Sequence, residues 1–248
     1  MDLSKNRVNP SNAPESGESA AGGGRRYGGV DKDERQRQRR QRLVEAALSV
    51  FGEVGFHGAT VRLVCKRAEL TSRYFYESFD SMEALFEAVY VSVSTDLMRR
   101  TMASLAATPM KPDLLAEASL RTFLEFIRED PHRARVALIE ALTVGAGMHR
   151  ISQESNKDFA RLIASFIGML YPTLEEETRL NPIYIAHGLV GSNIRIATLW
   201  VEDKCSLPLD DVLRNMFAFY QAAITYADVQ LKAAREERAK AQGKAPKA

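Results

Sequence analysis

The sequence predicts an all-α protein with an N-terminal three-helix domain, which contains a helix-turn-helix, and a larger C-terminal helical bundle. Apolar residues recur at helical spacing through most of the chain, and no segment alternates apolar and polar residues as a half-buried strand does. Prolines stand where several of these segments begin, as at Pro112, Pro131 and Pro182. The length of 248 residues, of which 45% are hydrophobic, suits one large or two small domains with a sizeable core.

Shifts of composition predict the domain boundaries. Residues 1–30 hold six glycines and almost no large apolar residue, so we expect a disordered N-terminal tail there. We expect the helix-turn-helix domain at residues 31–80 and the larger helical domain at residues 81–232. Residues 233–248 are rich in Lys, Arg, Ala and Glu, and we expect them to form a second disordered tail.

A basic run opens the first helix. Residues 35–42, RQRQRRQR, hold five arginines and no acid, and they lead into an amphipathic helix that Gly55 ends. From Arg35 to Tyr76 there are nine Lys and Arg against three Glu, on a chain whose formal net charge is only +2. Such a local patch indicates contact with phosphates, while a solvated face is the ordinary meaning of a charge run.

Two short helices follow, and the second is predicted to expose one polar face. The first, residues 61–68, has apolar residues at helical spacing and Thr60 in the N-cap position. On the second, Phe75 and Phe79 share a face and serve as inner anchors. The side chains left to point outward are Thr71, Ser72, Arg73, Tyr74 and Tyr76. This arrangement is a candidate helix-turn-helix, although two amphipathic helices with ordinary surface side chains look the same in sequence.

The remaining helices are predicted from their caps and apolar stripes. Asp80 to Glu83 reads as a capping box, with Asp80 as the N-cap of a helix that runs to about Leu105. The later helices are expected at residues 112–129, 131–145, 152–170, 182–203 and 208–232, with an acidic turn at residues 175–177.

Several classes of protein are not expected. The two cysteines lie far apart without the spacing of a zinc site, and the four histidines are scattered. The chain has no glycine-rich phosphate loop and no nucleophile with a base, so we expect no catalytic residue, no metal and no cofactor. The longest apolar-rich run, residues 183–201, contains His187, Asn193 and Arg195 and is not expected to span a membrane. The N-terminus lacks the apolar core of a signal peptide, so we expect a cytoplasmic protein.

An ordered set of residues runs from the end of the first helix into the fourth. It comprises Phe51, Gly55, Phe56, Thr60, Ala68, Leu70, Thr71, Tyr76, Phe79, Glu83 and Leu85. In order and spacing, residues 36–90 resemble the N-terminal DNA-binding domain of TetR-family transcriptional regulators. Glu69 departs from the family pattern because it stands where the turn usually has Gly, and a positive φ there would strain it. Met82 also departs, because it stands where a phosphate-binding Lys is frequent.

The resemblance implies a homodimer that places two recognition helices in successive major grooves of a palindromic operator in double-stranded DNA. Arg73 and Tyr74 are then expected to contact base edges. Phosphate or mixed contacts are expected from Arg40, Arg42, Thr60, Arg62, Thr71, Ser72 and Tyr76. Occupancy of the operator blocks a promoter, so we expect a repressor; the alternative is an activator or an architectural DNA-binding protein without an effector.

The resemblance also implies a pocket for a small-molecule effector in the helical body. The candidate lining residues are Phe123, Phe126, Leu142, Phe166, Met169, Asn193 and Trp200, with Ile127, Leu138 and Tyr184 as further candidates. Plain core packing is the alternative for each apolar one. The scarcity of charges among them favours a mainly apolar or amphipathic effector.

Two features favour dimerisation through the last two long helices. Residues 212–224 carry two adjacent apolar stripes, which is more than one core-facing side requires. Residues 183–200 mix small residues with large ones, which permits close approach of helices. The resemblance implies that these helices pair across a two-fold axis as a four-helix bundle, whereas the alternative is that both stripes are internal core.

Overall fold

The computed structural model describes residues 26–243 and the side chains of residues 31–241. The described residues belong to two units, one ending at Gln38 and the other beginning at Arg39. Residues 1–25 and 244–248, which belong to the predicted tails, lie outside the described residues.

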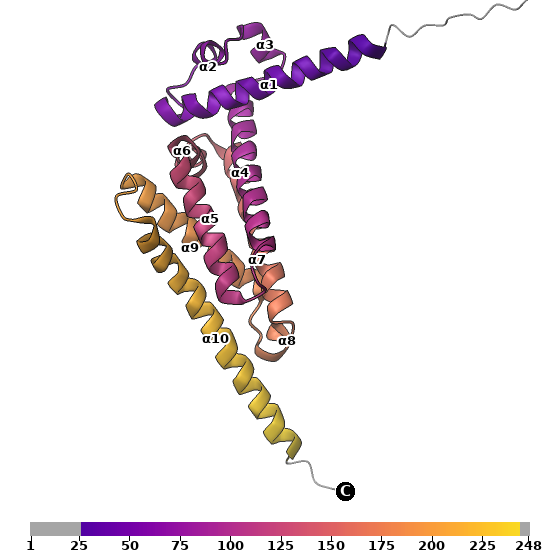
Figure 1. Cartoon of the computed structure of the whole chain (residues 1–248), viewed down its shortest axis with the longest axis vertical. Coiled ribbons are helices and arrows are strands. Elements are labelled where there is room, and N and C mark those ends of the chain that lie inside the picture. The colour runs from indigo at the N-terminus through magenta and orange to yellow at the C-terminus, as the bar shows by residue number, and fades with distance from the viewer. Residues whose placement is uncertain (1–25, 244–248) are drawn as a thin grey trace, which may run out of the picture. The chain divides into compact units, whose positions relative to one another are not determined.

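The described residues form helices joined by short turns (Figure 1). No strand occurs among residues 26–243, and the all-α prediction is confirmed. In chain order the elements are α1 (Arg26–Val54), α2 (Val61–Ala68), α3 (Ser72–Tyr76), α4 (Met82–Ala106), α5 (Pro112–Glu129), α6 (Pro131–Leu138), the 3-10 helix η1 (Glu140–Leu142), α7 (Ala146–Leu170), α8 (Leu174–Thr178), α9 (Pro182–Glu202) and α10 (Leu209–Gly243).

Within the first unit, residues 26–30 are helical, whereas we expected them to be disordered. Arg35 lies 3.0 Å from Asp31, and Arg37 lies 2.7 Å from Glu34. Pairs at these spacings favour a helix. The two acids precede the basic run and offset part of its charge.

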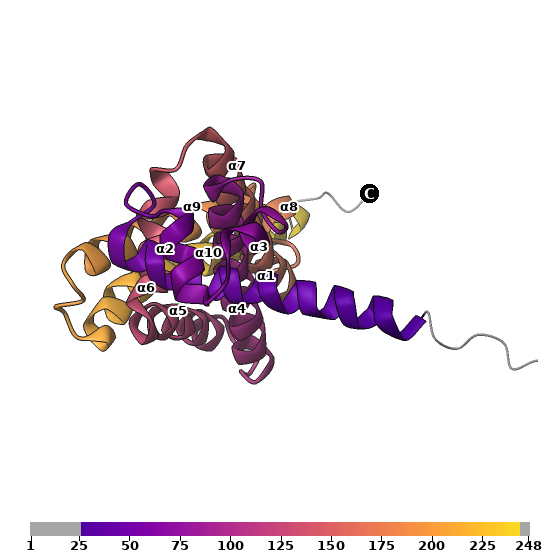
Figure 2. The same ribbon diagram turned by 90° about the horizontal axis from the view of Figure 1, so that it is seen from above.

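An aromatic core holds the start of the second unit together. Phe51 of α1, Phe56 of the following loop and Phe86 of α4 meet with ring centroids 5.0, 5.5 and 5.9 Å apart. Gly55 ends α1 with φ at 75°, in the left-handed region that a glycine adopts without strain, so the predicted end of this helix is confirmed. Helices α2 and α3 lie together beside the later part of α1, and α4 runs from there into the helical body (Figures 1 and 2).

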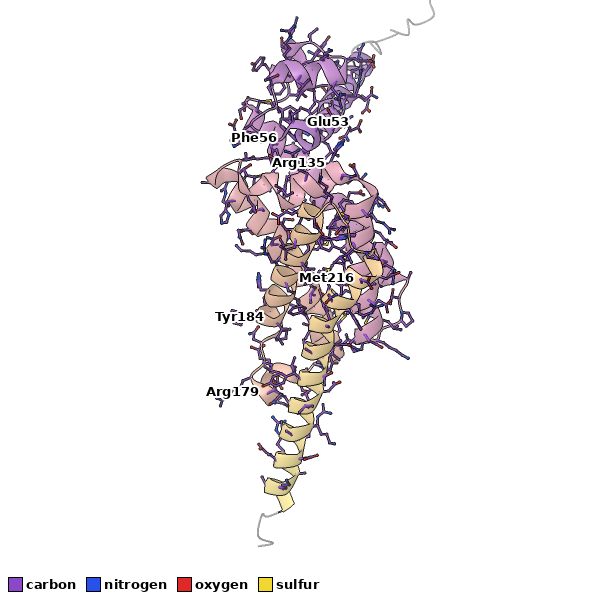
Figure 3. The ribbon with its side chains drawn as sticks, turned by 90° about the vertical axis from the view of Figure 1, so that its left-hand side faces the viewer. Glu53, Phe56, Arg135, Arg179, Tyr184 and Met216 are labelled. Atoms are coloured by element: carbon purple, nitrogen blue, oxygen red, sulfur yellow. The ribbon has the colours of Figure 1, made fainter. Side chains whose placement is uncertain are left out.

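In the helical body, α5, α6, α9 and α10 pack around a second core. Helix α9 lies against α7 and α10, and α5 lies against α4 and α10. Leu120, Leu124, Trp200 and Met216 are buried in this core, and Figure 3 marks Met216 on α10. Burial of each such side chain stabilises the fold by about 1.5–3 kcal/mol. Across the described residues, none of the helices combines the length and the hydropathy that crossing a lipid bilayer requires.

Two predicted helix ends need correction. Ser81, not Asp80, caps α4, because its hydroxyl accepts a hydrogen bond from the backbone N–H of Ala84 at 3.1 Å. Helix α10 continues to Gly243, where a disordered tail over residues 233–248 was expected. Lys, Arg, Ala and Glu all favour a helix, and no helix breaker precedes that glycine.

Candidate nucleic-acid interface and internal cavity

The turn between α2 and α3 has the geometry that the sequence predicts, including its strained residue. The Thr60 hydroxyl accepts a hydrogen bond from the backbone N–H of Leu63 at 3.2 Å and caps α2. Glu69 ends α2 with φ at 54° and ψ at 41°, and its N–H donates to the carbonyl oxygen of Lys66. A residue with a Cβ is about 1–2 kcal/mol less stable in this conformation. Met82, the second departure from the family pattern, is partly buried against the aromatic core.

Helix α3 turns a polar face outward over a buried aromatic anchor. Phe75 is fully buried and Phe79 nearly so, as the spacing predicts. The Arg73 side chain is 84% exposed, and its Nε donates to the Glu77 carboxylate at 2.9 Å. The exposed side chains of this face are Thr71, Ser72, Arg73 and Tyr76.

Tyr74 is only partly exposed, which corrects the prediction that it points freely outward. The guanidinium of Arg39 lies 4.6 Å from the centre of its ring, a cation–π contact between α1 and α3. Arg40 stacks in the same way on Phe79 at 4.7 Å. The two aromatic rings therefore hold two arginines of α1 beside α3. The prediction did not include Arg39, because its spacing alone does not show which aromatic ring it meets.

Arg42 has a structural contact that the sequence prediction missed. It donates to the carbonyl oxygen of Ala68 at 2.7 Å and lies 3.7 Å from the Glu69 carboxylate. The first contact satisfies a carbonyl at the end of α2, which has no partner inside its own helix. Arg40 and Arg62, which were also expected to contact phosphates, have exposed side chains.

A cluster of polar contacts, the polar clasp, joins the helical body to the end of α1 (Figure 3). The buried Glu140 carboxylate accepts hydrogen bonds from the backbone N–H of Phe56 and from Arg135 Nε, each at 2.9 Å. Arg135 also donates to the carbonyl oxygens of Gly52 and Glu53, each at 3.2 Å. These contacts satisfy backbone groups that the end of a helix leaves without partners.

The segment that carries the polar clasp also explains a difference in helix boundaries. A single helix was expected to run from Pro131 to about Gly145, but α6 ends at Leu138 and η1 follows. Glu140 turns its carboxylate toward partners outside its own helix, and the regular α-helix does not continue through it. The signal in the sequence was this single charge within VALIEALTV, and the prediction did not use it.

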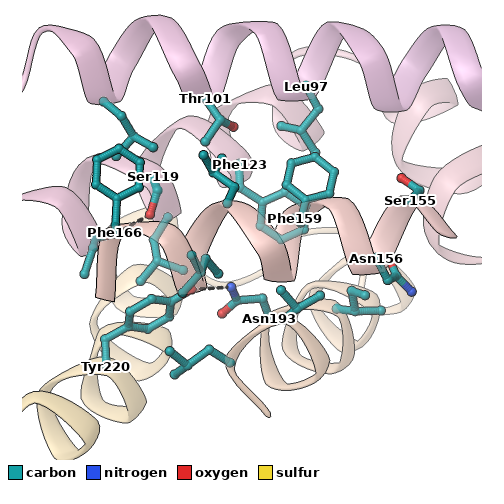
Figure 4. A pocket seen from close by; sticks show the side chains of 18 of the residues that line it. Leu97, Thr101, Ser119, Phe123, Ser155, Asn156, Phe159, Phe166, Asn193 and Tyr220 are labelled. Atoms are coloured by element: carbon teal, nitrogen blue, oxygen red, sulfur yellow. Dashed lines mark hydrogen bonds between the residues drawn. The ribbon is translucent and has the colours of Figure 1, made fainter. Parts of the chain in front are cut away.

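A cavity of about 270 Å³ lies within the helical body, close to the lower end of the range of ligand pockets, roughly 300–1,000 Å³ (Figure 4). It is enclosed by α4, α5, α7, α9 and α10, with α6 and η1 at one side. Leu142 also belongs to its wall and is 72% exposed, so it lies at the mouth. The predicted residues that line it are Phe123, Phe126, Ile127, Leu138, Leu142, Phe166 and Asn193.

Three predicted lining residues lie elsewhere. Met169 is 58% exposed on α7, and Tyr184 is 78% exposed on α9. Trp200 is buried in the core, and its indole N–H donates to the carbonyl oxygen of Leu207 at 3.0 Å. Periodicity places residues on a helix face, but it does not distinguish a face at the cavity from one at the core or in solvent.

Two polar side chains meet in the wall of the cavity (Figure 4). Asn193 Nδ2 donates to the Tyr220 hydroxyl at 2.8 Å. Burial raises the pKa of Tyr220 to about 12, although the bond from Asn193 opposes this shift, so the phenol stays neutral near pH 7. His187 and Arg195, the other two polar residues named in the apolar-rich run, are exposed on α9. The sequence prediction missed Tyr220 as a cavity residue, because its spacing places it within an apolar stripe of α10.

One face of α9 and α10 remains exposed and is largely apolar. On α9, Gly188 and Gly191 face open space, with the exposed Tyr184 on the same stripe. On α10, Phe219 and Tyr226 are more than half exposed. The structure thus divides the stripes of these helices between the core and the surface.

Comparison with known proteins relates the first part of the chain to one family, and longer matches to curated relatives cover most of the chain. Residues 43–89 match the family described as bacterial regulatory proteins, tetR family. The transcriptional activator FasR of Mycolicibacterium smegmatis is 30% identical over 210 residues, which cover 83% of this chain and 90% of FasR. The regulator UidR of Escherichia coli is 38% identical over 50 residues, so the match spans only about a quarter of UidR, 26% of its length and 20% of this chain.

Solved structures share the fold at low sequence identity. FadR of Bacillus halodurans, a fatty acid degradation regulator, superposes with a TM-score of 0.65 at 16% identity, over 73% of this chain and 94% of that one. FadR of Bacillus subtilis, in complex with stearoyl-CoA, superposes with a TM-score of 0.66 at 14% identity, over 73% of this chain and 96% of that one.

Proposed function

Because this chain belongs to the tetR family of bacterial regulatory proteins and is a DNA-binding transcriptional regulator of that type, we propose that it acts as a homodimeric repressor. In this proposal the dimer binds a palindromic operator in the cytoplasm, and a small, mainly apolar effector releases it. The observation that carries the proposal is the polar face of α3, held outward by a buried aromatic anchor.

The DNA contacts are assigned from exposure and partners. Arg73 reads a base edge, because its guanidinium is exposed and its partner among the described residues, Glu77, directly follows the same short helix. Tyr74 acts through Arg39, and Arg42 stabilises the turn as well as lying near the phosphates. Phosphate or mixed contacts come from Arg40, Thr60, Arg62, Thr71, Ser72 and Tyr76.

The effector part of the proposal is supported by the cavity and by one structural neighbour. The cavity lies in the helical body, and its wall is mostly apolar. FadR of Bacillus subtilis has the same fold in a complex with stearoyl-CoA, a ligand with a long apolar chain. An effector changes operator affinity only if it binds the two conformations of the protein with different affinities.

The polar clasp offers a physical connection between cavity and DNA interface. Leu138 and Leu142 line the cavity, while Arg135 and Glu140 of the same segment hold the end of α1. In our proposal, a ligand that displaces the cavity side of this segment changes how α1 is held. The recognition helices of the dimer then lose the separation that the operator requires.

The sign of regulation has a named alternative. FasR, which matches most of this chain, is a transcriptional activator. Repression predicts a binding site that overlaps the promoter, whereas activation predicts a site upstream of it. Transcription in vitro from the bound promoter, with and without the protein, decides between the two.

A footprint tests the DNA-binding proposal. DNase protection of the region upstream of the gene should reveal an inverted repeat with half-site centres about 34–36 Å apart. Scrambling one half-site should weaken binding much more than scrambling the flanks. Protection that spreads over DNA of any sequence would instead favour an architectural DNA-binding protein.

A further inference from the structure

The wall of the cavity is apolar over most of its extent, and it has room for more than a small solvent molecule. Phe123, Phe159 and Phe166 contribute aromatic rings (Figure 4). A volume of about 270 Å³ corresponds to roughly nine water-sized groups, at about 30 Å³ for each. Since a methylene group is of similar size, the cavity accepts an apolar chain or a small ring system.

Asn193 and Tyr220 bring unused hydrogen-bonding capacity into this apolar wall. Asn193 Nδ2 donates to the Tyr220 hydroxyl, so the hydroxyl hydrogen remains free to donate to another group. Asn193 Oδ1 is buried and accepts no hydrogen bond from any residue that the structure describes. A buried polar atom without a partner costs about 1–3 kcal/mol, and a ligand that supplies the partner recovers this free energy.

The pair presents one donor and one acceptor whichever way its amide is oriented. With the observed orientation, Tyr220 donates and Asn193 Oδ1 accepts. With the amide turned over, Tyr220 donates to Oδ1, while Nδ2 becomes the free donor and the phenol oxygen the free acceptor. In either arrangement, the best-matched ligand group both donates and accepts a hydrogen bond.

The charges around the cavity argue against an ionised ligand group at this pair. Arg133 is the one charged side chain among the described residues that line the cavity. Its guanidinium is 3.4 Å from Asp130 and 3.9 Å from Glu129, and it stacks on Phe126 at 5.0 Å. A carboxylate buried beside Asn193 and Tyr220 therefore meets two neutral groups, and desolvating it is costly.

We infer that the cavity takes a neutral amphipathic molecule, whose apolar part fills the aromatic wall and whose hydroxyl or amide group bonds to Asn193 and Tyr220. This inference rests on the proposed function, because it names the chemical class of the effector. An ester or thioester carbonyl accepts from Tyr220 but has no hydrogen to give Asn193 Oδ1, so it is a poorer match. A free carboxylate is poorer still.

A second phenol in the wall serves as the comparison site. Tyr90 also lines the cavity, and Ser94 and Ser155 lie beside its hydroxyl. A ligand group at Tyr90 therefore competes with these two serines. Tyr90→Phe removes the same chemical group as Tyr220→Phe from another part of the same wall.

Binding of four ten-carbon probes to the full chain tests the inference. The probes are decan-1-ol, decanamide, decanoate and decane, with affinity measured by calorimetry at pH 8. We expect decan-1-ol and decanamide to bind at least about tenfold more tightly than decanoate. Tyr220→Phe should weaken binding of decan-1-ol about fivefold, the equivalent of one hydrogen bond, and leave decane unchanged. Tyr90→Phe should leave the affinities for both probes unchanged.

A double variant guards against a loss of folding. Asn193→Leu combined with Tyr220→Phe removes both polar partners together, which leaves no unpaired group and should keep the melting temperature near that of the parent chain. It should also abolish the preference for the alcohol over the carboxylate. Equal binding of decanoate and decan-1-ol by the parent chain, or a loss with Tyr90→Phe instead of Tyr220→Phe, overturns the inference and leaves the apolar effector standing. If none of the four probes binds, both this inference and the proposed apolar effector are overturned.

Discussion

Arg73 and Arg62 are both exposed arginines of the helix-turn-helix, but we expect them to affect different properties of DNA binding. Arg73 lies on α3 and is expected to read a base, so Arg73→Ala should weaken operator binding by about 1–3 kcal/mol and relax specificity at one base pair. Arg62 lies on α2 and is expected to contact phosphate. Arg62→Ala should weaken binding to operator and random DNA alike and lower the salt dependence.

Gel-shift titrations on the operator, on single-base variants and on random DNA separate the two roles. The folding stability of both variants should change little, because exposed ion pairs such as Arg73–Glu77 contribute at most about 1 kcal/mol. If Arg73→Ala weakens operator and random DNA equally, Arg73 contacts the backbone and another residue reads the base.

Glu69 stores backbone strain at the turn between α2 and α3. A φ of 54° destabilises a residue with a Cβ by about 1–2 kcal/mol. Glycine avoids this cost, but the greater conformational freedom of glycine in the unfolded chain offsets part of the gain. Glu69→Gly should therefore raise the free energy of unfolding by about 0.5–1 kcal/mol in urea titrations. Arg179→Gly is the matched control, because Arg179 ends α8 with φ at 62°. Suppose that Arg179→Gly raises the free energy of unfolding but Glu69→Gly lowers it. The Glu69 side chain then stabilises the fold by more than its weak contact with Arg42 explains.

At the scale of elements, we expect the polar clasp to be the contact between helices whose removal lowers the free energy of unfolding most. Glu140→Ala leaves the Phe56 N–H and the Arg135 guanidinium without their buried acceptor. We expect a loss of about 2–3 kcal/mol in the free energy of unfolding, because such groups are costly when unpaired. Glu154→Ala is the control, since Glu154 pairs with Lys157 at 2.6 Å on an exposed face, and its effect on the free energy of unfolding should be much smaller. Equal losses in the two variants would show that the clasp does not hold α1.

The elements show where sequence reasoning succeeds and where it does not. The C-terminal end of α1 follows from Gly55 and the start of α2 follows from Thr60, because a helix stop and a cap act through neighbouring residues. The break between α6 and η1 depends on Glu140 bonding to Phe56, 84 positions away, and no local pattern contains that partner. Helix α10 continues beyond its predicted end. The prediction failed there because a composition rich in charges fits both a solvated helix and a disordered tail.

At the scale of the whole molecule, the same distinction applies to the candidate sites. The outward face of α3 was predictable, because Phe75 and Phe79 fix which side of a short helix is buried. The cavity was predictable only in part, because helices from distant parts of the sequence must meet to form it. Asn193 was identified as a polar residue in an apolar helix, whereas its partner Tyr220 became visible only from their distance of 2.8 Å.

The exposed apolar face of α9 and α10 is where we expect a second copy of the chain to bind. Gly191 faces open space, so an arginine there leaves the helix intact within the monomer and, because Gly is a poor helix former, stabilises it slightly. In a dimer the same side chain brings a charge and extra volume into a face where helices approach closely. Gly191→Arg should therefore shift the protein from dimer to monomer in sedimentation experiments at micromolar concentration.

Gly168→Arg is the matched control for this substitution. Gly168 is also exposed and also faces open space, but it lies on α7, which is not part of the proposed interface. The Gly168→Arg variant should stay dimeric and keep its operator affinity. Gly191→Arg should lose operator affinity far more than affinity for random DNA, because only a dimer presents two recognition helices to half-sites about 34–36 Å apart. If both variants sediment as dimers, the subunits pair through another surface, and the exposed stripe of α9 and α10 needs a different occupant.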